Sequence, residues 1–200
     1  METTRNKRMP ESIWKPPPKW PEDRGWMLAF DSFNAVVAMG LVGLLAVLFH
    51  APLIFPSLGA TAYLLFAHPH EQQAQARSAV LAHTCGAIIG WLAFKIIVVG
   101  IGEQPPSSAV TMLQPGAEMP AITIWLYVVA AALSIGLSLA VMVRTHTEHA
   151  PACSTALIFS MGLFQYLWQI GVLIAGVFLL VLLGKFLNRL IGYEVSMVSG

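Results

Sequence analysis

The chain has 200 residues, of which 56% are hydrophobic and only 10% are charged. Soluble domains carry roughly a quarter charged residues, so this composition excludes an ordinary soluble protein and indicates a protein that lies largely within a lipid bilayer. The formal net charge is +1, and no basic stripe interrupts the apolar segments, which argues against a nucleic-acid partner. The length suits one compact bundle of helices.

The N-terminal residues differ from the rest of the sequence. Residues 1–26 are rich in lysine, arginine and proline, with Pro16–Pro18 in the middle. They lack the short apolar core and the cleavage site of a secretory signal peptide. We therefore predict a basic, proline-rich cytoplasmic tail at 1–26, a membrane domain at 27–190 and a C-terminal tail at 191–200.

Within the membrane domain, long and short apolar segments alternate. A helix needs about 20 apolar residues to cross the hydrocarbon core, so four segments are long enough to cross alone. Two shorter segments of roughly 12 to 14 residues each open with a proline, which favours the first turn of a helix. We predict an all-α polytopic membrane protein with four long transmembrane helices and two proline-initiated short half-helices. The long segments are 27–49, 79–101, 121–143 and about 165–187, and the short ones are 56–67 and 151–164.

The charges predict how the segments are oriented. Lysine and arginine favour the cytoplasmic side of short loops. The basic N-terminal tail, Arg144, Lys185 and Arg189 should therefore be inside, and the linker 102–120, which has neither residue type, should be outside. All these assignments are satisfied together if both short segments cross the membrane. If both were re-entrant hairpins, the 102–120 linker would be inside and Arg144 outside, against the charge rule. We favour six crossings with both termini cytoplasmic, and expect a bacterial inner (plasma) membrane.

Geometry allows a short segment to cross. The extended residues 50–55 reach at most about 20 Å. The following helix adds roughly 18 Å at ~1.5 Å per residue. Together they cover a hydrocarbon core of about 30 Å.

The two short segments resemble each other. Gly59-Ala60-Thr61-Ala62 pairs with Cys153-Ser154-Thr155-Ala156, and each follows a proline by a few residues. The order long–short–long occurs twice, which would make 27–101 and 121–190 a 3+3 inverted repeat of the kind found in transporters. Two half-helices starting from opposite sides would aim free N–H groups near residues 59–61 and 153–155 at one site near mid-depth. Such a site suits a small anion. The alternative is that these small residues only allow helices to pack closely.

The residues of both short segments resemble the HPP family of small integral membrane proteins. The resemblance rests on PSLGATAYLLF at 56–66 with the later Arg77 and His83, and on HAPACSTAL at 149–157. The family is usually described with four transmembrane helices and a His-Pro-Pro motif. Ala150 replaces the first proline of that motif, Cys153 replaces a glycine and Ser154 replaces an alanine. Members in chloroplasts and cyanobacteria are linked to nitrite transport, so the resemblance implies a small monovalent anion as cargo.

Two histidines are of particular interest. His83 shares a helical face with Gly86 and Gly90, which form a GxxxG motif, so this face should pack on another helix. A histidine there would either make a structural hydrogen bond or line a substrate pathway. His149 precedes Pro151 in a stretch that should not be helical, and we expect no metal there because such sites usually need three or four ligands.

The sequence thus predicts a transporter or channel for a small inorganic anion, without a cofactor, a metal or a catalytic residue. Two alternatives stay open: an intramembrane hydrolase that uses Ser57 or Cys153 as nucleophile, and a non-transporting membrane scaffold. Expected partners are the anion and the lipid bilayer, and glycine-lined faces are compatible with a homo-oligomer. The expected substrate-binding residues are Ser57, Gly59, Ala60, Thr61, His83, Cys153, Ser154 and Thr155, with Arg77 and His149 along the entrance.

Overall fold

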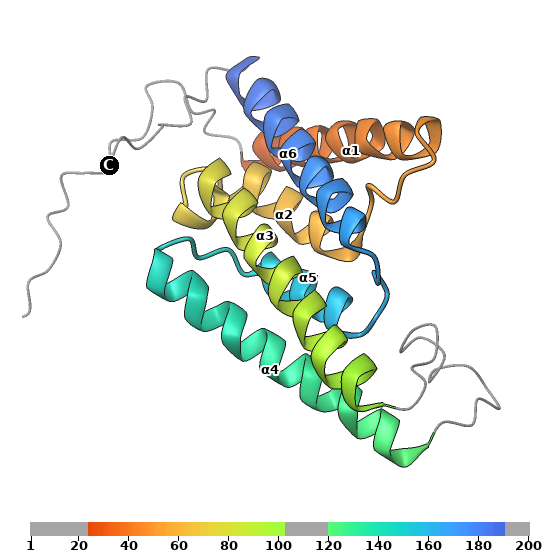
Figure 1. Cartoon of the computed structure of the whole chain (residues 1–200). Helices are drawn as coiled ribbons and strands as arrows, with labels where there is room; N and C mark the ends of the chain where they lie inside the picture. The colour runs from red at the N-terminus through yellow and green to blue at the C-terminus, as the bar shows by residue number, and fades with distance from the viewer. Residues whose placement is uncertain (1–23, 103–119, 191–200) are drawn as a thin grey trace, which may run out of the picture.

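The computed structural model describes residues 24–102 and 120–190, and all regular structure in this part is helical (Figure 1). Four helices are long and apolar enough to cross a membrane, and two shorter apolar helices begin with proline. This confirms the predicted fold class. Most of the N-terminal tail, nearly all of the 102–120 linker and the C-terminal tail lie outside the described residues. The helices are α1 (Arg24–Leu48), α2 (Pro56–Ala67), η2 (Gln72–Ala74), α3 (Ala76–Ala93), η3 (Phe94–Val99), α4 (Ala121–Thr145), α5 (Pro151–Ser160) and α6 (Leu167–Leu190).

The helix boundaries follow the sequence signals closely, with one correction. α2 has the predicted bounds, and Phe55 before it is extended, with φ −148° and ψ 158°. α5 ends at Ser160, whereas the apolar pattern predicted an end at 164. Gly162 has a φ of 69°, a left-handed conformation that ends a helix and that glycine adopts without strain. The apolar residues after Ser160 therefore belong to a turn.

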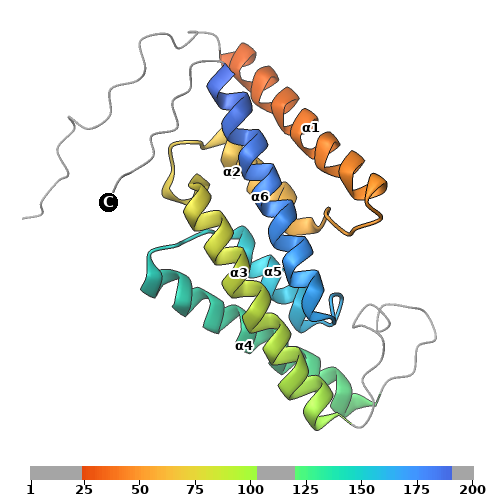
Figure 2. The ribbon, with the colours of Figure 1, turned by 45° about the horizontal axis from the view of Figure 1, so that its top comes forward.

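The helices form two flanks around a central pair. Figures 1 and 2 show α3 and α6 near the middle, α1 on the side of α6 and α4 on the side of α3. α2 packs against α1 and α6, while α5 packs against α3 and α4. The structure therefore places each short helix among longer ones. The inverted repeat and the sidedness of the termini stay predictions.

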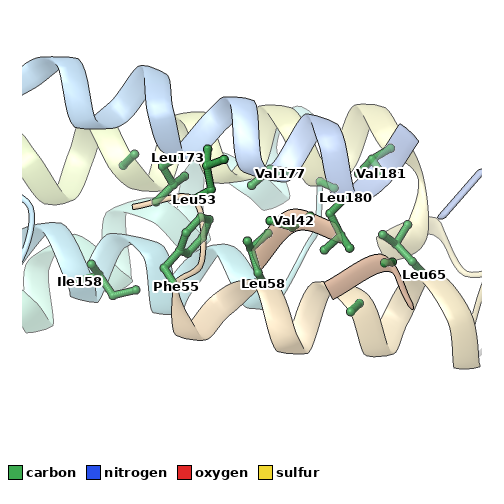
Figure 3. Close-up of a cluster of buried hydrophobic side chains, with 14 of the residues drawn as sticks. Val42, Leu53, Phe55, Leu58, Leu65, Ile158, Leu173, Val177, Leu180 and Val181 are labelled. Atoms are coloured by element: carbon green, nitrogen blue, oxygen red, sulfur yellow. The ribbon is translucent and has the colours of Figure 1, made fainter. Parts of the chain in front are cut away.

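The main apolar core joins α2 to α6. Figure 3 shows Leu58 and Leu65 of α2 facing Leu173, Leu180 and their neighbours on α6. These four leucines are nearly or fully inaccessible to solvent. In a water-soluble protein, burying an aliphatic side chain stabilises the folded state by about 1.5–3 kcal/mol. Within a bilayer the gain comes from close packing, because lipid tails are as apolar as leucine.

α5 lies directly against the backbone of α3. A Cβ atom added at Gly86 would lie 2.7 Å from the carbonyl oxygen of Ala152, and one added at Gly90 would collide with the carbonyl of Ala156. Only glycine allows this approach, which confirms that the GxxxG face packs on another helix and identifies α5 as the partner. This contact holds α5 beside the helix that carries His83.

The outer surface of the bundle is strongly apolar. Large side chains on the flanking helices are more than half exposed, including Val36 at 70% and Val47 at 72% on α1 and Trp125 at 65% on α4. A soluble monomer rarely exposes so extensive an apolar surface. These side chains suit contact with lipid.

Candidate functional site

Five polar side chains meet in the interior of the bundle, where the helices α2, α3 and α5 come together. None of the five is more than 1% exposed. A buried polar group in a membrane protein is costly unless it is paired, and such groups commonly mark ion or substrate pathways. We call this group the hydroxyl–imidazole cluster. Its members are Ser57, Thr61, His83, His149 and Thr155.

Short hydrogen bonds link the five side chains into one chain. Ser57 Oγ lies 2.8 Å from Thr155 Oγ1, and Thr155 Oγ1 lies 2.6 Å from His83 Nδ1. Thr61 Oγ1 lies 3.0 Å from Nε2 of His83 and 3.0 Å from Nε2 of His149. The centroids of the two imidazole rings are 5.0 Å apart. The hydroxyl of Thr61 therefore bridges the two histidines.

The cluster arises because α2 and the N-terminal half of α5 lie side by side in opposite directions. Ser57 contacts Thr155, whereas Thr61, one turn further along α2, contacts His149, which precedes α5. Residues four apart share one face of a helix, so Ser57 and Thr61 both point at α5. His83 reaches the same place from α3, which α5 contacts through the glycine face.

The main chain of the α2–α3 connection holds His149 in place. His149 Nδ1 lies 2.6 Å from the carbonyl oxygen of Gln73, and the backbone N–H of Ala150 donates to the side-chain oxygen of Gln73 at 3.1 Å. Gln73 is not among the residues predicted from the sequence, and no signal in the sequence points to it, because its contact to the histidine uses a main-chain carbonyl that every residue carries.

The partner at Gln73 determines the direction of the hydrogen bonds. A carbonyl oxygen only accepts, so Nδ1 of His149 carries a hydrogen, and in the neutral ring Nε2 is then an acceptor. The Thr61 hydroxyl has two acceptors within 3.0 Å, this Nε2 and the carbonyl oxygen of Ser57. When it donates its single hydrogen to Nε2 of His149, it can only accept from Nε2–H of His83.

The direction then continues to the other end of the cluster. With its hydrogen on Nε2, His83 accepts at Nδ1 from the hydroxyl of Thr155, which in turn accepts from the hydroxyl of Ser57. Every donor in this order has one acceptor. The neutral cluster is thus one directed chain that runs from Ser57 to the carbonyl of Gln73.

The hydrogen bonds of the cluster are made by side chains, whereas the sequence predicts that backbone amides near residues 59–61 and 153–155 form the site. The amide of Cys153 donates to the carbonyl of Ala150 at 3.1 Å, and that of Leu58 donates to the carbonyl of Phe55 at 3.0 Å. These two first-turn amides, one at each helix start, are therefore paired with local carbonyls. What meets between α2 and α5 is hydroxyl and imidazole groups.

The remaining predicted site residues lie apart from the cluster. Gly59, Ala60 and Ser154 are exposed, Cys153 is half-buried, and Arg77 is exposed in the first turn of α3. The structure therefore brings together five of the ten predicted residues. The other five predicted residues lie on the same segments of the chain but do not face the cluster.

The cluster also lies closer to one end of the bundle than the predicted mid-depth. His83 is about 10 Å along α3 from its first residue, at ~1.5 Å per residue. The whole span Ala76–Val99 has 24 residues, which corresponds to about 36 Å. The site is nearer the α2–α3 connection because α5 starts directly after the loop that contacts Gln73.

No fixed charge lies among the cluster residues. In the part of the chain that the structure describes, no lysine, arginine, aspartate or glutamate side chain is buried or hydrogen-bonded to the cluster. The same residues contain no group of three or more His, Cys, Asp or Glu side chains that could hold a metal ion. The cluster offers hydrogen bonding by neutral hydroxyls and by two imidazole rings, each of which has one N–H donor and one acceptor nitrogen when neutral.

Comparison with known protein families agrees with this architecture. The family model described as HPP, transmembrane region, matches residues 21–195, which is most of the chain. Comparisons with curated proteins and with solved structures gave no match. The match spans the six α-helices of the described residues, including both proline-initiated ones. The chain is therefore an integral membrane protein that belongs to the HPP transmembrane-region family.

Proposed function

We propose that the protein transports a small inorganic anion, as a carrier or a channel, and that nitrite is the candidate cargo. One observation carries the proposal. Nε2 of His83 and Nε2 of His149 both lie 3.0 Å from a single oxygen, the Thr61 hydroxyl. An oxygen atom of a small anion in that position would accept hydrogen bonds from two imidazole N–H groups when both rings carry a hydrogen there.

The surroundings of the cluster support this assignment. The edge of Phe55 and the ring of His83 are in contact, with centroids 6.3 Å apart, and apolar residues of α2 and α6 form the adjoining core. In such a low-dielectric environment each hydrogen bond to an anion is stronger than it would be in water. The resemblance of the two motifs to proteins linked with nitrite transport favours nitrite over larger anions.

Arg77 has a separate role in this proposal. It is exposed in the first turn of α3, close in sequence to the connection that holds His149. A fixed cation at the end of a helix raises the local concentration of anions. We propose that it attracts the cargo toward the end of the bundle where the cluster lies.

The proposal treats the protein as a transporter without enzymatic activity. An intramembrane hydrolase needs a nucleophile within reach of a base. The hydroxyl of Ser57 pairs with Thr155 and with no imidazole among the described residues, and Cys153 is half-buried outside the cluster. A non-transporting scaffold would use the same hydrogen bonds only to hold α2 and α5 together, so the two ideas differ in whether the cluster supports flux.

Flux in proteoliposomes separates these ideas. Purified protein should take up nitrite several-fold faster than protein-free vesicles and should not take up sulfate. Replacing Thr155 by valine keeps the side-chain shape and removes the hydroxyl that contacts both Ser57 and His83. Losing that contact, at about 1–2 kcal/mol, should lower nitrite flux roughly 5- to 30-fold.

A matched substitution controls for the loss of a hydroxyl from a membrane helix. Thr84 lies beside His83 in the sequence, but its hydroxyl donates to the carbonyl of Val80 at 2.7 Å on its own helix, outside the cluster. Thr84→Val should leave nitrite flux within twofold of the wild type. If wild-type vesicles take up nitrite no faster than protein-free vesicles, the transport proposal is wrong.

A further inference from the structure

We infer that the cluster binds its anion together with one proton, which His149 takes up, so that the anion and the proton cross the membrane together. This inference rests on the proposed function and adds the coupling ion. Its basis is the arrangement of hydrogen bonds around Thr61, together with the absence of a fixed cation among the described cluster residues.

An anion bound in the cluster needs a counter-charge. An unpaired ion in a low-dielectric interior is strongly disfavoured, and proteins avoid the cost by pairing or neutralising it. A buried arginine or lysine would be the usual partner for an anion, but each such side chain that the structure describes is exposed or half-buried. A proton on an imidazole is therefore the counter-charge that these residues can supply.

The cluster accommodates one extra proton without losing a hydrogen bond. Besides the two histidines, Thr61 Oγ1 has a third neighbour, the carbonyl oxygen of Ser57 at 3.0 Å. When His149 is neutral, Thr61 donates to its Nε2. When His149 carries hydrogen on both nitrogens, Thr61 turns its hydrogen to the carbonyl of Ser57 and accepts from both histidines.

These two arrangements leave the rest of the cluster unchanged. His149 keeps its Nδ1 hydrogen on the carbonyl of Gln73 in both, and Thr155 keeps donating to His83. Rotation of one hydroxyl hydrogen is the only adjustment. A hydroxyl with one available acceptor could not do this, so the carbonyl of Ser57 makes Thr61 a switch between the two protonation states.

One proton enters and leaves the cluster in each transport cycle. The lone pair on Nε2 of His149 takes a proton from hydronium, forming an N–H bond and releasing water. Both Nε2–H groups then point to one position, which the Thr61 oxygen occupies in the structure; on anion binding the Thr61 side chain rotates away and an oxygen of the anion accepts there. On the other side the anion leaves, and Nε2 returns its proton to water. One cycle moves one anion and one proton, and therefore no net charge.

The titratable and charged side chains on the neighbouring elements do not join the cluster. Tyr63 on α2 pairs with His68, and Glu71 in the α2–α3 connection also pairs with His68. Eight further titratable or charged side chains on the elements packed around the histidines are exposed or half-buried, and none of these eight is hydrogen-bonded to the cluster. They are Arg77 and Cys85 on α3, Arg144 on α4, His146 and Glu148 before α5, Cys153 on α5, and Lys185 and Arg189 on α6. Tyr127 on α4 is buried, and its ring contacts Phe94 with the centroids 6.3 Å apart.

Proteoliposomes under a controlled membrane potential test the coupling in the wild-type protein, so no variant needs to fold. Initial rates of nitrite uptake are measured after subtraction of protein-free vesicles, through which nitrous acid itself diffuses. A gradient of one pH unit, acidic outside, should drive nitrite inward against up to about a tenfold concentration difference, since one pH unit is a tenfold ratio of protons. A potassium diffusion potential of either sign should change the rate by less than twofold.

Different outcomes distinguish failure of this inference from failure of the proposed function. Protein-dependent nitrite flux that follows the membrane potential and ignores the pH gradient would overturn proton coupling and leave anion transport standing. No protein-dependent nitrite flux at all would overturn the proposed function itself. His149→Gln assigns the proton site. Its remaining flux should follow the potential, and unchanged proton coupling in this variant would show that the proton binds elsewhere.

Discussion

Replacing Thr61 by valine removes the hydroxyl that joins the two histidines and keeps the size and branching of the side chain. The side chain is fully buried, and its oxygen lies 3.0 Å from Nε2 of His83 and from Nε2 of His149. Thr61→Val therefore leaves one donor and one acceptor without a partner inside the bundle. It should destabilise the protein.

The expected size of the effect depends on the environment. In a water-soluble protein, each unsatisfied buried group would cost about 1–3 kcal/mol. Hydrogen bonds between transmembrane helices average only about 0.6 kcal/mol and reach about 1.7 kcal/mol, because the unfolded chain in the membrane also finds partners. The loss of two such bonds thus predicts a decrease of about 1–3 kcal/mol in the free energy of unfolding.

Two further variants make the measurement decisive. Thr61→Ser keeps the hydroxyl and loses one buried methyl group, so it should cost about 1 kcal/mol through packing alone and should retain proton-coupled flux. Thr84→Val removes a hydroxyl that donates within its own helix, and should change stability by less than about 0.5 kcal/mol. Unfolding would be followed by circular dichroism in mixed micelles with increasing denaturing detergent. A Thr61→Val protein as stable as Thr84→Val would refute the assignment of a hydrogen-bonded bridge.

A close helix contact and an interhelical hydrogen bond each predict the effect of a substitution on stability. Gly90→Ala places a Cβ against the carbonyl of Ala156 and should lower the free energy of unfolding by about 1–3 kcal/mol through overpacking. Gly136→Ala on α4 is the control, because no atom lies within 4 Å of its new Cβ. It should be neutral or raise the free energy of unfolding by up to about 1 kcal/mol. Equal stability of the two variants in the same detergent titration would argue against the α3–α5 contact. Asn188→Leu removes the bond from Asn188 Nδ2 to the carbonyl of Leu65, 3.1 Å long and buried between α6 and α2. Its loss should lower stability by about 0.6–1.7 kcal/mol, and an unchanged unfolding midpoint would argue against that bond.

Local rules predicted the helices well, because the strongest signals in this sequence are local. Proline at the first helical position marked the start of α2 and of α5. The spacing of Gly86 and Gly90 predicted a close helix contact, but the sequence could not identify α5 as the partner because partner choice depends on the tertiary arrangement. The end of α5 was misplaced because apolar residues continue past Ser160, and a single glycine sets the turn.

The site was predicted only in part, and helix geometry explains the difference. Within one motif, Ser57 and Thr61 are four residues apart and share a face, so both reach the cluster. Gly59, two residues on from Ser57, points to the opposite side and is exposed. Ser154 is rotated by about 100° from Thr155 on α5 and is exposed for the same reason. Comparing the two sequence motifs predicted whole segments as site residues. The helical period of about 3.6 residues determines which side chains of each segment face the cluster.

Whether backbone amides are free at the start of a helix depends on the residues that precede it. A helix that begins with proline has unpaired first-turn amides only if no preceding carbonyl can accept them. The residues before α5 turn so that the carbonyls of His149 and Ala150 accept from Ala152 and Cys153, at 3.0 and 3.1 Å. The conformation of that loop depends on the contact with Gln73, which lies far away in the sequence.

The tautomers of the two histidines test the directed hydrogen-bond chain most directly. Nitrogen-15 spectra of labelled protein in lipid bilayers, at a pH where both rings are neutral, distinguish a ring nitrogen that carries hydrogen from one that does not. His149 should carry its hydrogen on Nδ1, facing the carbonyl of Gln73, and His83 should carry its hydrogen on Nε2, facing Thr61. Signals are assigned with His83→Gln and His149→Gln proteins. Hydrogen on the same nitrogen in both rings, or free exchange between tautomers in either one, would contradict the account.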